Sequence, residues 1–381
     1  APEKPKVAKK PTEDIALTAS RGKETRHHPL ERPVKRKIAK GRLALEARID
    51  LHGMIQSDAH GFLLHGDADT WMDARIRGAD PWSPRGDRAC DIQALWYTAL
   101  RIGVHIARFL GDDAKSAERT ELAARVKLSF RRFFWCDDRR ALADRLPPGG
   151  HGEWLRDFRV RPNQLFAITV PAILGGESEE DQLLDAASRL QVLDNVRREL
   201  VSPFGLFSLC PDDPLFHPRH EHPDWYHKDA AYHNGTIWVW NTGPYVSASV
   251  AGAVPSSSST LPCISEALLR NEARMVTGMG CVGSLSENIF AEPDSEGNPV
   301  LSGTFSQAWS VSEFARNVWQ DVIGFRPCLA ENRIVIHPHL PAGTDRWTAR
   351  PIFGPNWSLS IELERRTARG TTGIHCRLVW H

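Results

Sequence analysis

The chain has 381 residues, of which 41% are hydrophobic and 25% are charged, an ordinary globular composition with ample apolar material for a large core. Its 48 Lys and Arg nearly balance its 47 Asp and Glu, which removes any argument from overall charge for a nucleic-acid partner. No apolar run approaches the roughly 20 residues of a membrane-spanning helix, so no membrane partner is expected.

Residues 1–42 differ from the remainder of the chain. They hold 13 Lys and Arg against 5 Asp and Glu, few apolar residues and no sustained hydrophobic period. This composition predicts a basic tail that is disordered or loosely attached. An arm that binds RNA or an acidic partner is the alternative interpretation.

From residue 43 onward the pattern is helical. The clearest helix is predicted over residues 91–111, where apolar side chains recur every three to four residues and Gly111 is a natural stop. Further helices are predicted over residues 114–134, 163–174, 180–190, 232–250, 265–277 and 307–323, and residues 43–51 have the pattern of a last helical turn. Seven helices in succession without βαβ alternation predict a mainly α fold.

The last 50 or so residues change character. Residues 333–336 and 358–364 alternate apolar and polar side chains, and residues 372–380 have the composition of a further strand. We therefore predict a helical catalytic domain over residues 43–326. A small antiparallel β appendage of two or three strands is predicted over residues 327–381.

The connecting loops carry unusual side chains. Trp71 lies close to Asp73, and Asp224 precedes Trp225, a combination that suits sugar binding by ring stacking and hydrogen bonds to hydroxyls. Glycoside hydrolysis needs a carboxylic acid that protonates the leaving oxygen and a second carboxylate opposite it. Glu287 follows two glycines, which allow a tight turn, and is a candidate for the second group.

Each of these features also has a purely structural interpretation. Asp73 could be a helix N-cap, and Glu287 could be a solvated loop acid or the partner of a neighbouring arginine. Trp238 and Trp240 could be core residues. Histidines 217, 220, 222 and 227 cluster without helical ligand spacing, and the seven cysteines show no CxxC spacing, so no metal site is predicted. Widely spaced thiols instead favour a reducing, cytoplasmic location.

Taken together and in order, seven motifs resemble those of the glycogen debranching enzymes, in their amylo-α-1,6-glucosidase module. The matching stretches lie at residues 70–74, 94–97, 161–164, 202–206, 232–238, 283–287 and 307–311. The resemblance implies an (α/α)6 barrel, a toroid of six helical hairpins with its site at one mouth. It also implies an inverting, exo-acting hydrolase that removes α-1,6-linked glucose and needs no cofactor.

Carried over to this chain, the resemblance makes Asp73 the general acid, with a raised pKa, and Glu287 the base that activates water. The positions implied to line the glucose pocket are Trp71, Trp96, Arg161, Asn163, Gln164, His233, Asn234 and Trp238. The chain departs from the family pattern in having Asp91 for Glu, Asn234 for Gln and Val239 for Pro. Shorter side chains at the first two positions are expected to weaken hydrogen bonds to the sugar.

Only 69 residues precede the Thr70–Ala74 motif, whereas family members have several barrel helices before it. The chain is therefore expected to hold roughly the second half of the barrel, with apolar helix faces left for a missing N-terminal half or a second chain. Two other functions stay open. One is a different inverting α-glucosidase on the same barrel, such as a glucoamylase or trehalase. The other is a catalytically silent carbohydrate-binding or subunit-interaction protein.

Overall fold

The structure is a computed structural model that describes residues 56–150, 153–172, 179–220, 228–252, 260–328, 333–353, 358–368 and 371–380. All of them belong to one compact unit, His52–His381. The predicted tail over residues 1–42 and the predicted helical turn over residues 43–51 lie outside the described residues.

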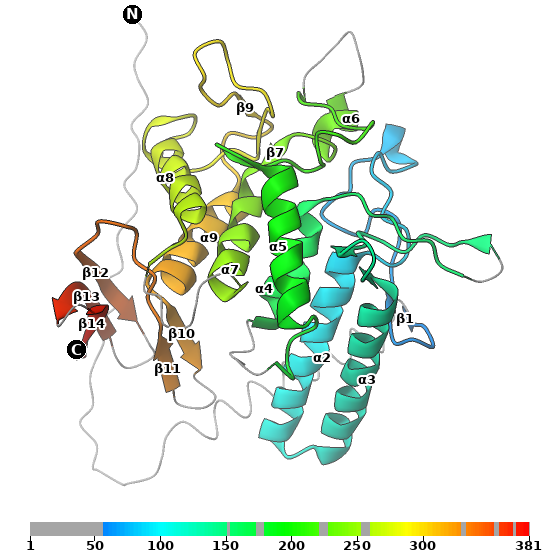
Figure 1. The fold of residues 1–381 in the computed structure, drawn as a ribbon, viewed down its shortest axis with the longest axis horizontal. Coiled ribbons are helices and arrows are strands. Elements are labelled where there is room, and N and C mark those ends of the chain that lie inside the picture. Colours follow the sequence, from blue (N-terminus) through cyan, green and yellow to red (C-terminus); the bar gives the residue numbers. More distant parts are fainter. Residues whose placement is uncertain are drawn as a thin grey trace, which may run out of the picture. The chain divides into compact units, whose positions relative to one another are not determined.

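The first long helices form an antiparallel hairpin, α2 (Cys90–Leu110) and α3 (Asp113–Phe133), which lie side by side in Figure 1. Gly111 ends α2 in the left-handed conformation, with φ 73°, where a side chain would be strained. Asp112 then caps α3 by accepting a hydrogen bond from the Lys115 amide. Both helices confirm the expectation from the hydrophobic period.

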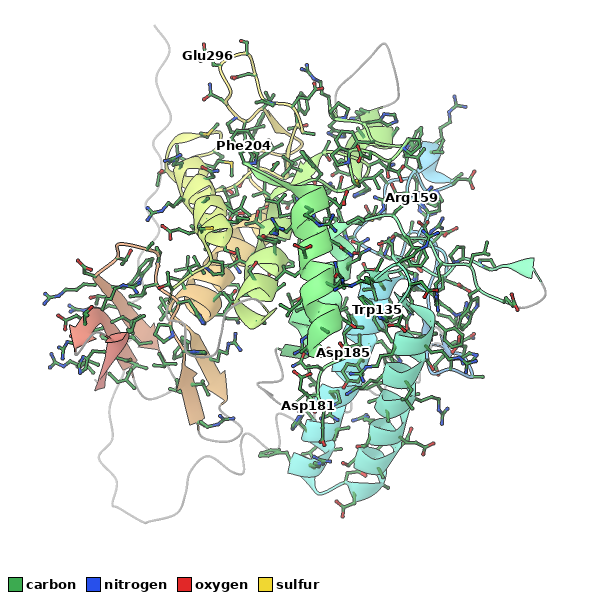
Figure 2. The ribbon with its side chains drawn as sticks, in the orientation of Figure 1. Trp135, Arg159, Asp181, Asp185, Phe204 and Glu296 are labelled. Atoms are coloured by element: carbon green, nitrogen blue, oxygen red, sulfur yellow. The ribbon has the colours of Figure 1, made fainter. Side chains whose placement is uncertain are left out.

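The helix predicted over residues 180–190 is wrong in its position. Helix α5 spans Ala186–Leu200, and its N-cap is Asp185, whose side chain accepts a hydrogen bond from the Ser188 amide. Asp181, labelled with Asp185 in Figure 2, instead forms an ion pair with Arg101 of α2. The helix therefore begins after the Asp185 cap, at Ala186, and not at residue 180 as predicted.

The long helix predicted over residues 232–250 is interrupted. Helix α6 (Lys228–Tyr232) ends at once, β7 (Ile237–Trp238) pairs with β8 (Asn288–Ile289), and α7 begins only at Thr242 and runs to Gly252. Gly235 makes the break possible, because its φ is 146° and the backbone of His217 occupies the space where a Cβ would lie.

Two other predicted helices are confirmed with small differences. Residues 265–277 lie in α8 (Cys263–Gly278). Residues 307–323 form α9 (Ala308–Arg316) and a π-helical continuation η5 (Asn317–Val322). The helix predicted over residues 163–174 begins as a 3-10 turn, η3 (Pro162–Leu165), and continues as α4 (Phe166–Ala172).

Short elements connect the helices. They are β1 (Gln56–Ser57), β2 (Leu63–Leu64), η1 (Ile76–Gly78), β3 (Trp135–Cys136), β4 (Ala141–Leu142), β5 (Val201–Ser202), β6 (Gly205–Leu206), η4 (Val239–Asn241) and β9 (Leu301–Ser302). Strands β8 and β9 are joined by a long hairpin whose outer end carries Glu296, labelled in Figure 2. This hairpin follows directly on Glu287.

The C-terminal β structure is confirmed. Strands β12 (Arg346–Phe353), β13 (Ser358–Ala368) and β14 (Thr371–Trp380) form an antiparallel sheet, and β10 (Phe325–Cys328) pairs separately with β11 (Arg333–Ile336). The buried face of the sheet shares a hydrophobic core with helices α7 and α8, through residues such as Leu359, Val246 and Leu269. The domain boundary at residue 327 stays a prediction.

Helix α2 presents apolar side chains to solvent as well as to the core. Leu95 is 43% exposed and Ile102 is 40% exposed, seven residues apart on one face. The expectation that a missing half or a second chain covers such helix faces stays a prediction. Among the described helices, none is long and apolar enough to cross a membrane.

Candidate active site

An aromatic cluster surrounds the loop that holds Asp73. It consists of Trp71, His233, Trp238, Trp240 and Trp309. The ring of Trp71 meets those of His233, Trp238 and Trp240 edge-on, at centroid distances of 5.2, 5.4 and 5.2 Å. The His233 and Trp238 rings are stacked 5.0 Å apart. Edge-to-face and offset packing of this kind fixes ring orientations.

Trp71 is held in place by a buried amide. Its indole N–H donates a 2.6 Å hydrogen bond to Asn163 Oδ1, and Asn163 Nδ2 donates a 3.0 Å hydrogen bond to Asp144 Oδ1. Met72, the next residue, is fully buried and its sulfur contacts the same amide. The loop before Asp73 is therefore anchored from beneath.

A buried charge network lies under this anchor. The Asp144 carboxylate pairs with Arg85, which also donates a 2.8 Å hydrogen bond to Asp91 Oδ1, and all three side chains are almost completely buried. Arg161 Nε lies 3.9 Å from Asp144 Oδ2. Burial lowers the pKa of Arg161 to about 9. Buried charges of this kind must be paired, because removing one partner strands the other away from water.

Arg161 and Asn234 position the backbone beneath His233. Arg161 donates hydrogen bonds to the His233 carbonyl at 2.6 Å and to Asn234 Oδ1 at 2.7 Å. Ser83 donates to the same Asn234 oxygen, and Asn234 Nδ2 donates to the Ala230 carbonyl. Both side chains are buried and hydrogen-bonded to other groups of the protein, so they support the backbone at His233.

Asp73 itself is on the surface. Its side chain is 70% exposed, and Oδ1 lies 3.7 Å from Nε2 of His233. The interaction with His233 lowers the pKa of Asp73 and outweighs the opposing effect of partial burial. The expected rise in this pKa is therefore wrong for the structure, because the carboxyl group is solvated and faces an imidazole. Asp73 caps no helix: the residue before η1 is Arg75.

His233 is fully buried, and burial lowers the pKa of its imidazole. The ring is therefore neutral at pH 7, with one nitrogen able to donate and the other able to accept. The 3.7 Å approach to Asp73 is longer than a normal hydrogen bond. Among the described residues neither ring nitrogen has a hydrogen-bond partner.

Glu287 is nearly buried and accepts three hydrogen bonds. The Tyr232 hydroxyl donates to Oε1 at 2.6 Å, Gln307 Nε2 donates to Oε1 at 3.2 Å, and the Thr304 amide donates to Oε2 at 3.1 Å. These three donors hold both oxygens of the Glu287 carboxyl group. Among the described residues it has no ion pair with an arginine.

The two acids converge on neighbouring residues of one segment. Asp73 approaches His233, Glu287 accepts from Tyr232, and the rings of Tyr232 and His233 are 4.7 Å apart. Burial raises the pKa of Tyr232, and the negative charges of both Glu287 and Asp73 add to that rise. Asp73 and Glu287 are thus connected through the adjacent side chains of His233 and Tyr232.

The sequence matches one known family over most of its length. The profile of the amylo-alpha-1,6-glucosidase family matches residues 33–316. The chain belongs to the amylo-alpha-1,6-glucosidase family. Among curated proteins, no significant match to the chain was found.

Solved structures support a six-hairpin glycosidase fold for this family member. A sialidase matches with a TM-score of 0.59 at 14% identity, over 88% of this chain and 29% of the other. A GH78 family rhamnosidase of Bacillus sp. GL1 matches with a TM-score of 0.53 at 13% identity, over 90% of this chain and 30% of the other. The chain therefore spans less than a third of either structure and corresponds to part of a larger fold.

Of the predicted site residues, the structure brings together Trp71, Asp73, Asn163, His233 and Trp238, with Glu287 across Tyr232. Trp96 lies elsewhere: its indole N–H donates to the Gly61 carbonyl and its ring packs against the core around α2. Among the described residues no hydrogen bond or ring contact joins it to the aromatic cluster. The roles of the predicted residues stay predictions.

Gln164 also points away from the aromatic cluster. Its Nε2 donates hydrogen bonds to the Leu142 and Arg159 carbonyls, and its side chain is buried. Its contacts therefore make it a support for the loop that carries Asn163.

The departures from the family pattern also have protein partners. Asp91 binds Arg85, and Asn234 binds Arg161, so both of the shorter side chains are held by arginines of the protein. Val239 donates its amide to the Glu287 carbonyl at 3.2 Å, a hydrogen bond that proline could not make. These three departures from the family pattern therefore affect residues that support the site.

Sequence reasoning missed several residues of the site. Tyr232 and Gln307 lie inside two of the seven family motifs, and this is the sequence signal that could have identified them as neighbours of Glu287. Asp144 had no signal, because its partners Arg85 and Asn163 are distant in sequence. Trp240 and Trp238 are buried as the core interpretation expected, yet both contact Trp71.

One group of potential metal ligands is present among the described residues: Glu199, Cys210 and Asp212. Burial, with a hydrogen bond to Glu199, raises the pKa of the Cys210 thiol to about 11. A protonated thiol is a poor metal ligand. None of these three residues belongs to the aromatic cluster around Trp71.

Proposed function

We propose that this chain supplies the acid and the base of an inverting glucosidase that removes α-1,6-linked glucose from branched α-glucan. The observation that carries the proposal is the convergence of Asp73 and Glu287 on Tyr232 and His233. Hydrolysis of a glycosidic bond requires two carboxyl groups, and these two acids, far apart in sequence, contact adjacent residues of one segment. Membership of the amylo-alpha-1,6-glucosidase family supports the choice of substrate.

In this proposal Asp73 is the general acid. It is ionised in the free protein, where it is exposed beside His233. A glucose unit packed on Trp71 would exclude water from Asp73, and desolvation favours the protonated form. The acid would then be able to give its proton to the leaving oxygen.

Glu287 is the proposed base. Tyr232, Gln307 and the Thr304 amide hold its carboxylate in one orientation, which leaves further lone pairs for a water molecule. Inversion needs carboxyl groups about 6.5–9.5 Å apart, with that water between base and anomeric carbon. The expected first product from an α-linked substrate is β-glucose.

The rest of the barrel is proposed to come from residues outside this chain, either a preceding segment of a longer polypeptide or a second chain. The exposed Leu95 and Ile102 of α2 are where we expect one of its helices to pack. Sugar contacts from that part would complete the pocket around Trp71.

The test is glucose release from a branched limit dextrin, with maltose and trehalose as comparison substrates. We expect release from the dextrin, β-glucose as the first product by NMR, and losses of several orders of magnitude in Asp73→Asn and Glu287→Gln. Release mainly from maltose or trehalose would favour another α-glucosidase. Dextrin binding without hydrolysis would favour a silent binding protein, and α-glucose as first product would exclude Glu287 as the base.

A further inference from the structure

A large groove in the described part of the chain is remote from Asp73 and Glu287. It has a volume of about 950 Å³, and its lining includes the C-terminal end of α3, residues 146–147 and residues 153–159. Figure 2 labels Arg159, which lines it, and Trp135, which follows α3. Its volume is within the range of small-ligand sites. Neither the family match nor the proposed function assigns it a role.

Arginine dominates the lining of this groove. Four guanidinium groups line it, those of Arg132, Arg139, Arg156 and Arg159, against the carboxyl groups of Glu153 and Asp157. Asp157 is already neutralised, because Arg145 and Arg159 bind it at 2.9 and 2.7 Å. Among the described residues Arg132 and Arg139 have no carboxylate partner, so the groove carries uncompensated positive charge.

These two arginines are positioned by aromatic rings. The guanidinium of Arg132 lies over Phe133, 5.0 Å from the ring centroid, and that of Arg139 lies over Phe158 at 4.8 Å. A guanidinium stacked on a ring keeps its in-plane N–H groups free for an anion. The ring of Trp154, 4.9 Å from that of Phe133, continues the aromatic lining.

The groove is also fixed by the backbone. Arg156 donates hydrogen bonds to the Phe133 carbonyl at 2.7 Å and the Arg132 carbonyl at 2.8 Å. Both carbonyls belong to the last turn of α3, where no helical partner exists for them. Arg156 thereby ties the segment after residue 152 to the end of α3 and holds the two walls together.

We propose that this groove binds a sugar that carries a phosphate ester. Guanidinium groups without a carboxylate partner match the oxygens of a phosphate, and the half-buried aromatic rings supply apolar surface for a pyranose. A neutral glucan would leave Arg132 and Arg139 without a partner. The same chemistry is found in a free hexose phosphate and in a phosphorylated unit of an α-glucan chain, and the test distinguishes these two sources.

The first experiment is affinity electrophoresis of the full chain in gels that contain phosphorylated amylopectin or the same polymer after phosphatase treatment. We expect stronger retardation by the phosphorylated polymer. Neutral glucan binding at the Asp73 site slows migration equally in both gels, so the difference isolates the phosphate. Equal migration in the two gels would overturn the proposal, and this comparison needs no variant.

The second experiment uses the double variant Arg132→Gln/Arg139→Gln. We expect about tenfold or greater weakening of phosphate-dependent retardation, since two charge-assisted contacts are lost. The matched control is Arg197→Gln/Arg198→Gln on α5, which removes the same charge from a surface pair bound to Asp194. An equal loss in the control would reduce the effect to overall charge and overturn the site.

The third experiment titrates glucose 6-phosphate into the protein by calorimetry. Binding that depends on Arg132 and Arg139 would identify a free hexose phosphate as a ligand. Phosphate-dependent gel retardation without calorimetric binding would identify the phosphorylated glucan chain instead. Because these measurements of binding need no hydrolysis, they remain interpretable if the proposed function fails.

Discussion

The Tyr232 hydroxyl lies 2.6 Å from Oε1 of Glu287 and donates a hydrogen bond to it. Tyr232 ends α6, whereas Glu287 precedes β8, so this bond joins two parts of the chain that local structure alone would not bring together. The pairing of Ile237 in β7 with Ile289 in β8 places them side by side. The orientation of the proposed base therefore depends on a strand pairing in the middle of a helical fold.

Removing this hydroxyl should impair catalysis while leaving the fold intact. In Tyr232→Phe, Glu287 keeps the Gln307 and Thr304 donors but loses its shortest hydrogen bond. A hydrogen bond to a charged group is worth about 1.5–3 kcal/mol, so kcat for dextrin should fall roughly tenfold to a hundredfold. Steady-state kinetics with a melting curve would measure this.

The matched control for that substitution is Tyr97→Phe. The Tyr97 hydroxyl donates to the Asp181 carbonyl, between α2 and the segment before α5. We expect a small loss of stability and an unchanged kcat. If both variants lose activity equally, the Tyr232 effect is structural, and the hydroxyl has no special role beside Glu287.

A glycine beside Glu287 gives a second prediction. Gly303 has φ 67°, and a Cβ there would collide with Glu287 Oε2 and approach Asn288 Oδ1 to 2.7 Å. Gly303→Ala should therefore displace the carboxylate and lower kcat at least tenfold, beyond the cost of backbone strain.

Gly297→Ala separates strain from collision. Gly297, in the same hairpin, has φ 83°, and no atom of the described residues outside its own neighbours lies within 4 Å of the point where a Cβ would stand. Both variants should lose about 1–2 kcal/mol of stability from the left-handed backbone. Only Gly303→Ala should lose activity. Comparable activities in the two variants would show that Glu287 tolerates the added methyl group.

The acid–base properties of Asp73 give a third prediction. His233 lowers the pKa of Asp73 more than Arg75 does. In His233→Asn we expect the pKa of Asp73 to rise, whereas Arg75→Gln should raise it less. NMR titration of ¹³C-labelled aspartate carboxyl groups would measure both shifts. An unchanged Asp73 titration in His233→Asn would mean that solvent, rather than His233, sets this equilibrium.

Sequence patterns succeeded where structure is set locally. The apolar period of α2 and the stop at Gly111 depend on neighbouring residues, and so does the alternation in β13. The predicted helix over residues 232–250 is wrong in its middle, because Ile237 pairs with Ile289 in a strand although the local composition is helical. The local hydrophobic periodicity cannot reveal that a residue pairs with a partner 52 positions away.

The same distinction explains the site. Trp71, Asp73 and Glu287 were recognised because they lie in short motifs. The support beneath them was not, since Asp144 depends on Arg85 and Asn163, which the fold alone brings together. Trp96 also lies in a family motif, but its indole is bound to the Gly61 carbonyl, so its role in a sugar pocket stays a prediction.

The last prediction concerns stability and pH. Glu272 on α8 is buried near Thr242 and Glu313, and burial raises its pKa well above 4.5. A carboxyl group with a raised folded-state pKa contributes stability below its unfolded pKa and loses it as pH rises toward the folded value. Wild-type stability should therefore fall on the alkaline side, where Glu272 must either ionise in the core or remain protonated at a cost.

Glu272→Gln keeps the shape and removes the titration, so the variant should be more stable than wild type by about 1–3 kcal/mol at pH 8 and nearly equal to it at pH 4. Glu266 on the same helix is the control with the opposite sign. Burial acts to raise its pKa, but hydrogen bonds from the Ala342 amide and Arg270 prevail and lower it. Its contribution is present above pH 4.5 and lost as pH falls through the folded value, so Glu266→Gln should be less stable than wild type at pH 8.

Urea unfolding of both variants at pH 4 and pH 8 measures these differences in stability. A Glu272→Gln variant that is destabilised at pH 8 would show that the Glu272 carboxyl group is ionised and stabilised in the folded protein.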